Sequence, residues 1–234
     1  DVPAEGLGWW LQGQLGQANL AGLRSMDAQT LTVSAQQAGY APFGNIDGVY
    51  LPAQLAQVFD RGEQAPVPIL AGVNQGEIRS LRFLVAPAPA DAAAYEKEIR
   101  DRYGELADTF LSFYPADDMA ESMLATPRDA LYGWTAERLM RSQTARGQNA
   151  YLYFFDHGYP AADDADLHAF HASEIPFVFG NADKTPPRWP AIPDTPVEQA
   201  LSDAMMSYWL SFARSGVPTA EGQPDWPAYG RTGA

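Results

Sequence analysis

The chain has 234 residues, of which 46% are hydrophobic and 12% aromatic, so it can bury a sizeable core and is unlike a disordered protein. Its formal net charge of −14, with only two lysines, argues against partners such as nucleic acid or an anionic membrane surface. Cysteine is absent, which excludes a disulfide framework, a thiolate metal site and a cysteine nucleophile. No apolar run approaches the roughly 18 residues of a membrane span.

The first part of the chain predicts helices followed by one buried strand. Residues 7–24 carry apolar positions at mixed helical spacing, and Ser25 is expected to cap a helix that continues to about Ala38. Residues 40–53 contain Pro, Gly, Asn and Asp and predict a loop with a short strand. Residues 66–73 (PVPILAGV) predict a fully buried strand of a parallel sheet, because the run is short, apolar and bounded by turn residues.

The second part predicts three helices and another buried strand. Residues 91–103 indicate a helix that stops at a glycine, and Thr126 is expected to cap a helix that runs to about Arg146. Residues 150–155 (AYLYFF) predict the second strand. The motif TPVE at 195–198 predicts a capping box with proline at the first helical position, for a helix that runs to about residue 215.

Two buried strands separated by helices indicate the α/β class with a parallel sheet. Two or three strands are too few for such a sheet, since its edges need neighbours. The chain also starts almost directly in a helical pattern without an initiator Met and stops shortly after a Trp-Pro pair. These features lead to the expectation that sequence is missing, chiefly before residue 1.

Candidate catalytic residues follow the two predicted strands, where open α/β sheets place their working side chains. Glu77 follows the first strand, whereas His157, His168 and His171 follow the second. An acid followed by a histidine is the partial order of an α/β-hydrolase triad. Spacing alone leaves two alternatives open, namely a metal pair of His168 and His171 without a second ligand cluster, and ordinary structural histidines.

Six segments spread over nearly the whole chain carry a more specific signal. They are LAGLRSMDAQTL (20–31), NIDGVYLP (45–52), PVPILAGVNQGEIRSL (66–81), AYLYFFDH (150–157), HASEIPFVFG (171–180) and YWLSFARSGVPTAEGQPDWPAY (208–229). In this order they resemble the C-terminal portion of type-B carboxylesterases. This family includes bacterial para-nitrobenzyl esterase-like enzymes, the cholinesterases and the non-catalytic neuroligins.

The resemblance implies an α/β-hydrolase fold, of which residues 1–234 would form the C-terminal part of a single domain, with the last strands of the sheet and their covering helices. It implies hydrolysis of a small-molecule carboxylic ester through a Ser-Glu-His triad and an acyl-enzyme, without a cofactor or metal. The alternative is a non-catalytic binding or adhesion module, as in neuroligins. A bacterial periplasmic or secreted location is favoured by the same resemblance.

Carried over residue by residue, the resemblance assigns the acid to Glu77 and the general base to His171. His168 lies outside the motif and is interpreted as a neighbour. Glu174 is expected to be a partly buried carboxylate that pins the histidine loop through backbone or arginine contacts. His157 is expected to be structural, at the end of its strand.

The resemblance also suggests residues of a substrate pocket. Tyr40 and Phe43 fall where the family lines its acyl pocket, and Ser80 and Leu81 fall near the wall of the gorge. The run 175–179 is expected to belong to the core rather than to the pocket. Gly76 stands where the family often has aspartate, a difference that is expected to reshape the wall beside the acid.

The nucleophile of the family is absent from the chain. No Gly-x-Ser-x-Gly motif occurs among the 234 residues, and the glycine run of the oxyanion hole is missing as well. Both lie upstream in the family. We therefore expect an upstream N-terminal chain or segment as a partner, and an isolated chain that does not hydrolyse esters.

Overall fold

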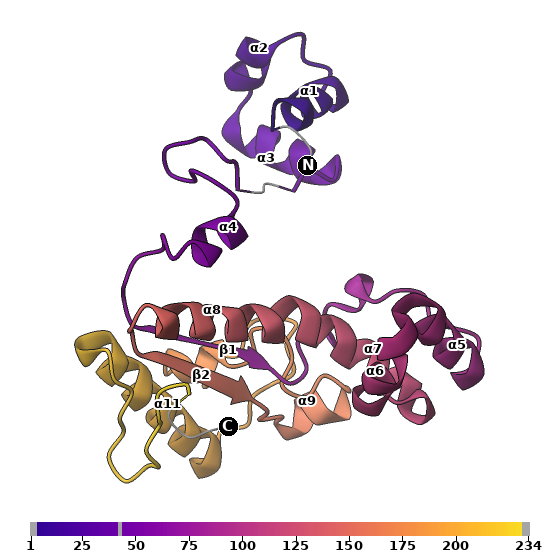
Figure 1. Cartoon of the computed structure of the whole chain (residues 1–234). Helices are drawn as coiled ribbons and strands as arrows, with labels where there is room; N and C mark the ends of the chain where they lie inside the picture. Colours follow the sequence, from indigo (N-terminus) through magenta and orange to yellow (C-terminus); the bar gives the residue numbers. More distant parts are fainter. Residues whose placement is uncertain (1–3, 42–43, 231–234) are drawn as a thin grey trace. The chain divides into compact units, whose positions relative to one another are not determined.

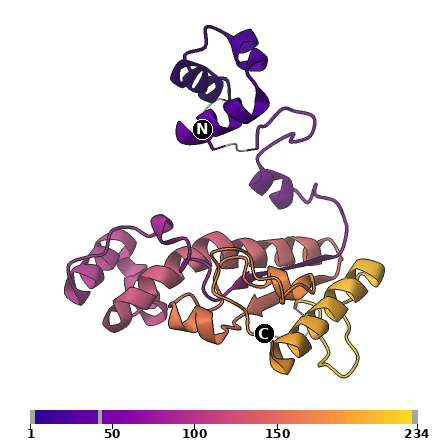
Figure 2. The same ribbon diagram turned by 180° about the vertical axis from the view of Figure 1, so that it is seen from behind.

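The computed structural model describes residues 4–41 and 44–230, and the chain forms two compact units, residues 1–64 and 65–234 (Figure 1). The same ribbon is seen from behind in Figure 2. The assignment of residues 1–234 to one domain stays a prediction. Within the ranges that the structure describes, no helix is both long and apolar enough to cross a membrane.

The first unit is helical. It contains α1 (Ala4–Gln14), α2 (Leu20–Ser25), α3 (Ala28–Gln37) and α4 (Leu55–Asp60). The predicted cap at Ser25 is wrong, because this residue ends α2. The cap of α3 is Asp27, whose carboxylate accepts a hydrogen bond from the backbone N–H of Thr30 at 2.9 Å. A carboxylate also interacts favourably with the positive end of the helix dipole.

The short strand expected within residues 40–53 does not form in the described part of that segment. Instead, one carboxylate oxygen of Asp47 accepts hydrogen bonds from three successive backbone N–H groups, at 2.9, 2.9 and 3.0 Å. These bonds curl the backbone into a turn, since the donors that a neighbouring strand would use are already satisfied by the side chain.

The second unit contains a parallel pair of strands, as predicted, but the expected full burial is wrong, because residues 69–72 are half-buried and Phe154 is 55% exposed. β1 (Ile69–Asn74) pairs with β2 (Ala150–Phe155) in a register that places Ile69 opposite Ala150 and Asn74 opposite Phe155. Because the strands are parallel and in register, their carboxyl ends lie at the same edge of the sheet, and the loops that follow them start side by side. This arrangement positions the candidate site.

Helices cover the strands, with α8 (Trp134–Ala145) running along them and α11 (Pro196–Ser215) packing against β2 (Figure 1). The aromatic rings of Tyr153 and Trp209 have centroids 5.3 Å apart and join β2 to α11. Gly72 lies opposite Tyr153 in the sheet, and a Cβ at this glycine would lie 2.3 Å from the tyrosine ring. Glycine is therefore required where the ring crosses β1.

The predicted helix after Thr126 is wrong at its start. The chain is already helical through α7 (Met119–Arg128), continues as the π-helix η4 (Asp129–Gly133) and then enters α8. Pro127 lies inside α7, and the hydroxyl of Thr126 donates to the carbonyl of Ser122 instead of capping. Other short helices, which the sequence analysis did not predict, are η1 (Arg82–Leu84), η2 (Gly104–Leu106), α6 (Ala107–Phe113), η3 (Ala116–Asp118), α9 (Pro160–Asp164) and α10 (Ile175–Val178).

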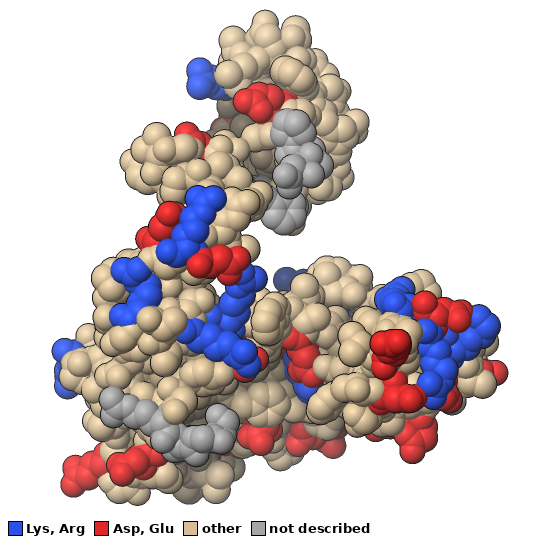
Figure 3. All heavy atoms as spheres, in the orientation of Figure 1, with Lys and Arg blue, Asp and Glu red and all other residues tan. Residues whose placement is uncertain are grey.

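Two predicted helices are confirmed. α5 (Ala92–Tyr103) begins after Asp91, whose side chain accepts from the N–H of Ala94 at 2.8 Å, and Gly104 ends it. Figure 3 shows basic and acidic side chains interspersed over the helical cluster that contains α5, in accordance with its exposed ion pair between Arg100 and Glu96. Such exposed pairs contribute little to stability and keep the surface well solvated.

The start of α11 is also confirmed, with one difference. The hydroxyl of Thr195 accepts from the N–H of Glu198 at 3.4 Å, as in a capping box. The carboxylate of Glu198 does not return the bond. It contacts the imidazole of His157 at 2.7 Å, so this buried acid joins α11 to the end of β2 instead.

Candidate active site

The candidate site lies where the loops after β1 and β2 meet. The backbone N–H of Gln75 donates to the carbonyl of Phe155 at 2.8 Å, which continues the pairing of the strands. One residue later, the N–H of Gly76 donates to the carbonyl of Ala169 at 2.8 Å, and Gly76 forms an isolated parallel bridge with Phe170. The loop that carries the acid is thereby attached to the loop that carries the histidine.

Gly76 allows this close approach of the two loops. A Cβ at this position would lie 2.5 Å from the carbonyl oxygen of Leu167 and 2.9 Å from that of Ala169, both backbone atoms that cannot rotate away. Replacing this glycine by the aspartate that the type-B carboxylesterases often have would therefore disturb the contact between the two loops. Gly76 sets the distance between the two loops.

Gly76→Ala is expected to lower the free energy of unfolding by about 1–3 kcal/mol, because the added methyl group must push two backbone segments apart. Urea unfolding followed by circular dichroism measures the change. Gly133→Ala is the matched control, because its nearest neighbouring atom would lie 3.7 Å away and its backbone is helical. Equal stability of Gly76→Ala and the original chain would contradict this account of the loop contact.

The structure brings Glu77 and His171 together, although they are separated by 94 positions in the sequence. Nδ1 of His171 and Oε2 of Glu77 are 2.5 Å apart, and the other carboxylate oxygen accepts from the backbone N–H of Asn74 at 3.0 Å. The side chain of Glu77 is 7% exposed, whereas that of His171 is 44% exposed. A carboxylate can only accept when ionised, so this contact assigns the imidazole proton to Nδ1 and leaves Nε2 as an acceptor.

The backbone of the histidine loop is left-handed on both sides of His171. His168 has φ of 49° and Ala172 has φ of 69°, a region that non-glycine residues rarely adopt. Such positions persist only where surrounding contacts hold them, and they gather at functional sites. Behind the loop, Phe170 and the fully buried Phe177 belong to the main hydrophobic core of the second unit.

Glu174 pins the histidine loop, as expected, but through a different partner. Its Oε2 accepts from Nδ2 of Asn74 at 2.5 Å, a side-chain amide rather than the expected backbone or arginine group. The same Nδ2 also donates to the carbonyl of Phe170 at 3.0 Å. Asn74, the last residue of β1, therefore contacts the histidine loop on both sides of His171.

Arg79 forms a second connection around the site. This arginine is buried, with its side chain 5% exposed, and its guanidinium contacts Glu121 of α7 at 2.5 Å and Asp166 of the histidine loop at 2.6 Å. A buried guanidinium requires such partners, because an unpaired buried charge is costly. The acid loop, α7 and the histidine loop are thereby held to one another.

Two tyrosines surround the pair. The ring of Tyr132, from the π-helix, lies 5.6 Å from the imidazole of His171 between centroids, and burial together with the negative charge of Glu77 raises the pKa of Tyr132. Burial, followed by the charges of Glu174 and Glu77, raises the pKa of Tyr153 to about 12. Both phenols therefore stay neutral around the pair at physiological pH.

The other two histidines belong to separate contacts. His168 pairs with Asp163 at 2.7 Å and His157 with Glu198 at 2.7 Å, so neither contacts the Glu77–His171 pair. Among the residues that the structure describes, no group of three or more His, Cys, Asp or Glu could hold a metal ion.

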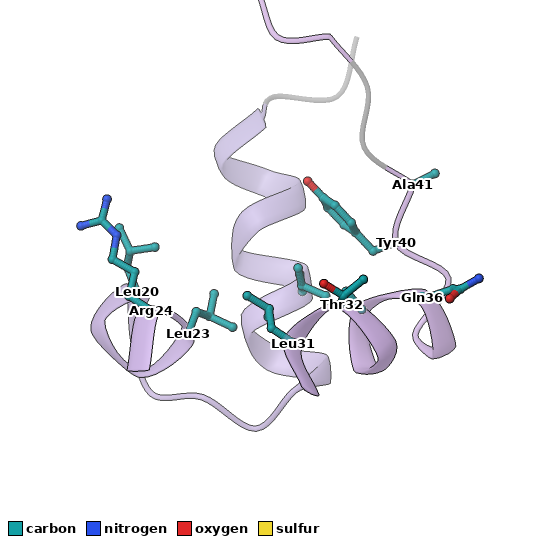
Figure 4. Close-up of a pocket in the computed structure, with 10 residues that line it drawn as sticks. Leu20, Leu23, Arg24, Leu31, Thr32, Gln36, Tyr40 and Ala41 are labelled. Atoms are coloured by element: carbon teal, nitrogen blue, oxygen red, sulfur yellow. The ribbon is translucent and has the colours of Figure 1, made fainter. Parts of the chain in front are cut away.

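The assignment of four residues to a substrate pocket stays a prediction. Ser80 is exposed and Leu81 half-buried, and they follow Glu77 by three and four residues on the acid loop. Tyr40 lies in the first unit, where it lines an apolar cavity of about 730 Å³ among α1, α2 and α3, together with residues such as Leu23 and Leu31 (Figure 4). Phe43 lies outside the described residues.

The expected core segment 175–179 is buried only in part. Phe177 is fully buried, whereas Ile175 is 45% and Phe179 72% exposed. The exposed side chains of Ile175, at the start of α10, and of Phe179, directly after it, show that the segment belongs to the core only in part.

Sequence reasoning missed three residues that hold the pair, namely Asn74, Arg79 and Tyr132. For Asn74 a signal existed, since a polar residue directly after a buried apolar run stands at the carboxyl end of the strand. For Arg79 and Tyr132 no local pattern exists, because their partners come from α7 and the histidine loop, far away in the sequence.

A parallel pair of strands covered by helices, with an acid and a histidine in contact on the loops after these strands, is the arrangement of an α/β-hydrolase. Solved structures agree with this class. A carboxylesterase of Geobacillus stearothermophilus is similar over 97% of this chain and 47% of its own, with a TM-score of 0.67 and 25% identity. A para-nitrobenzyl esterase structure is similar over 94% of this chain and 46% of its own, with a TM-score of 0.65 and 26% identity.

The sequence matches the model of the carboxylesterase family over residues 14–233, and the chain belongs to that family. The para-nitrobenzyl esterase of Bacillus subtilis (strain 168) is 28% identical over 230 residues, which cover 92% of this chain and 44% of the relative. The human cocaine esterase is 28% identical over 218 residues, covering 80% of this chain and 36% of the relative. The chain thus spans less than half the length of these relatives.

Proposed function

We propose that this chain supplies the acid and the general base of a serine esterase that hydrolyses small-molecule carboxylic esters. The observation that carries the proposal is the contact between Glu77 and His171, in which Nδ1 faces a buried carboxylate and the imidazole is 44% exposed. In the described part of the chain, Nε2 of His171 has no hydrogen-bond partner, so it is available to a nucleophile. Membership of the carboxylesterase family supports the same chemistry.

In this proposal, Nε2 of His171 removes the proton from a serine hydroxyl as the serine oxygen attacks the ester carbonyl. The protonated imidazole then gives the proton to the leaving alcohol, and an acyl-enzyme remains. His171 next removes a proton from water, whose oxygen attacks the acyl carbonyl. The protonated imidazole then gives this proton to the serine oxygen as the bond between the acyl carbon and that oxygen breaks, which releases the acid and the free serine. Throughout, Glu77 holds the tautomer and stabilises the imidazolium that forms in each step.

The serine is proposed to come from a segment that carries the Gly-x-Ser-x-Gly motif, which the 234 residues lack. The partners are therefore the ester substrate and this serine-bearing segment. The relatives' names refer to a para-nitrobenzyl ester, to cocaine and, for the medium-chain hydrolase of Anas platyrhynchos, to fatty acyl-CoA. This variety supports an acyl substrate without favouring one of them.

The test compares the isolated chain with a joined protein, defined as this chain extended by the segment encoded upstream in the same reading frame. The isolated chain is expected to hydrolyse a para-nitrophenyl ester no faster than buffer, because its base has no nucleophile to activate. The joined protein is expected to turn the ester over and to react covalently with a fluorophosphonate probe. Rapid turnover by the isolated chain, or an upstream segment without the motif, would contradict the proposal.

A further inference from the structure

Asn74 occupies a position between the two members of the candidate pair. It is the last residue of β1 and is 1% exposed. A buried carboxamide needs hydrogen-bond partners, since leaving a buried donor or acceptor unsatisfied destabilises the fold. The hydrogen-bond partners of the Asn74 side chain lie on the loop after β2. The position of this side chain is therefore coupled to the position of that loop.

The side-chain amide of Asn74 donates hydrogen bonds to the histidine loop at two points. Nδ2 donates to the carbonyl of Phe170, directly before His171, at 3.0 Å, and to Oε2 of Glu174 at 2.5 Å. Both partners are acceptors, so only the NH₂ group can face them, and the orientation of the amide is settled by its surroundings. An oxygen in the same place would meet two other oxygens.

The backbone of the same residue holds the acid. The N–H of Asn74 donates to Oε1 of Glu77 at 3.0 Å, which leaves Oε2 directed at Nδ1 of His171. One residue thus contacts the acid through its main chain and both flanks of the histidine through its side chain. A rotation of the Glu77 carboxylate or a shift of the loop would break one of these bonds.

We propose that Asn74 is a positioning residue for the Glu77–His171 pair, through the bridge from its amide to Phe170 and Glu174. The role rests on the proposed function only in its consequence for ester hydrolysis. The bridge fixes where the histidine loop lies relative to the acid, and so which nitrogen of His171 carries the proton. Asn74 itself does not reach the reacting atoms.

The bridge is tested by exchanging the amide of Asn74 and the carboxylate of Glu174 between the two positions. Asn74→Asp replaces the donor by an acceptor that faces the carbonyl of Phe170 and the carboxylate of Glu174, and it leaves the backbone bond to Glu77 in place. Adding Glu174→Gln to this variant returns an amide donor to the pair and restores the original net charge. Glu174→Gln alone keeps an acceptor for Asn74. Asn181→Asp, at an exposed residue, is the matched control for the added charge.

The first readout is ¹⁵N NMR of the His171 ring in the purified 234-residue chain, which reports the tautomer without any ester hydrolysis. We expect a protonated Nδ1 and an unprotonated Nε2 in the original chain and in two of the variants, Glu174→Gln and Asn181→Asp. Asn74→Asp is expected to lose this pattern, and the double variant is expected to recover it in part, since one of the two bonds returns. An unchanged pattern in Asn74→Asp, or no recovery in the double variant, would overturn the proposal.

Folding and activity provide the second readout. If Asn74→Asp fails to fold by circular dichroism, restored folding in the double variant supports the bridge, and its failure overturns it. In the joined protein, Asn74→Asp is expected to lower kcat by about 10²-fold with little change in KM, as for a displaced catalytic group. An inactive joined protein with an intact tautomer pattern would contradict the proposed function and leave the role of Asn74 supported.

Discussion

His171→Ala is expected to lower the kcat/KM of the joined protein toward a para-nitrophenyl ester by about 10⁴-fold or more. The imidazole is the group that can remove the serine proton in this site, and an alanine methyl leaves the nucleophile protonated. The loss should fall mainly on kcat, because His171 interacts with the transition state more strongly than with the bound ester. Initial rates over a range of ester concentrations separate the two parameters.

His168→Ala is the matched control for this variant. The two histidines are three residues apart on one loop, yet His168 pairs with Asp163 and not with Glu77. Its removal is expected to change kcat by less than about threefold, which reflects only a local loosening of the loop. Equal losses in the two variants would show that the loop as a whole matters and that His171 has no distinct role.

Glu77→Gln is expected to lower kcat by about 10³–10⁴-fold, with circular dichroism and thermal unfolding close to those of the original protein. Glutamine is nearly isosteric, and its carbonyl can still accept the N–H of Asn74, which binds Oε1 at present. Its NH₂ group would then face Nδ1 of His171 as a donor. The imidazole would have to carry its proton on Nε2, where it cannot accept the serine proton.

Glu96→Gln is the control for this loss of charge. Glu96 lies on α5 with its side chain 44% exposed and pairs with Arg100, so its neutralisation is expected to leave kcat unchanged. A Glu77→Gln protein that keeps more than about a tenth of the original kcat would exclude the acid role, since an orienting carboxylate contributes far more in such triads.

Three kinds of contact hold the acid loop and the histidine loop together, and each fixes a different aspect of their relative position. The N–H of Gly76 sets the backbone distance, Asn74 sets the orientation of the acid and the histidine, and Arg79 connects both loops to α7. The three residues that make these contacts lie within the six-residue stretch 74–79, at the end of β1 and in the loop that follows it. The site is therefore organised by the segment that carries the acid, around a histidine segment with left-handed backbone positions.

Elements with complete local signals were predicted correctly. α5 has a capping aspartate, Asp91, and a terminating glycine, and α11 has Thr195, a proline at its first position and Gly216. These signals act within one helical turn and need no tertiary partner. The strands were predicted from short apolar runs between turn residues, although the full burial that this pattern suggests is not reached in either strand.

Local signals misled where tertiary packing competes with them. The pair Thr126-Pro127 has the composition of a helix start, but α7 runs through it and continues into the π-helix at Asp129. Ser25 and Asp27 are both good caps, and only the structure shows which one is used. Glu198 has the position of a capping-box acid, yet its carboxylate contacts the imidazole of His157, beyond β2, instead of a backbone N–H of its own cap.

The sequence by itself determined the α/β class and the two strands, because apolar runs and turn residues are local properties of the chain. The assignment of the acid to Glu77 and of the base to His171 came from the resemblance to the carboxylesterase family, since spacing alone left other readings of the histidines open. Only the tertiary structure decided that Glu77 faces His171, that Glu174 binds Asn74 and that His168 is turned to Asp163. The physical reason is that a hydrogen bond depends on distance and direction within a few tenths of an ångström. Those are fixed by contacts such as Gly76 with Ala169, between residues far apart in the sequence.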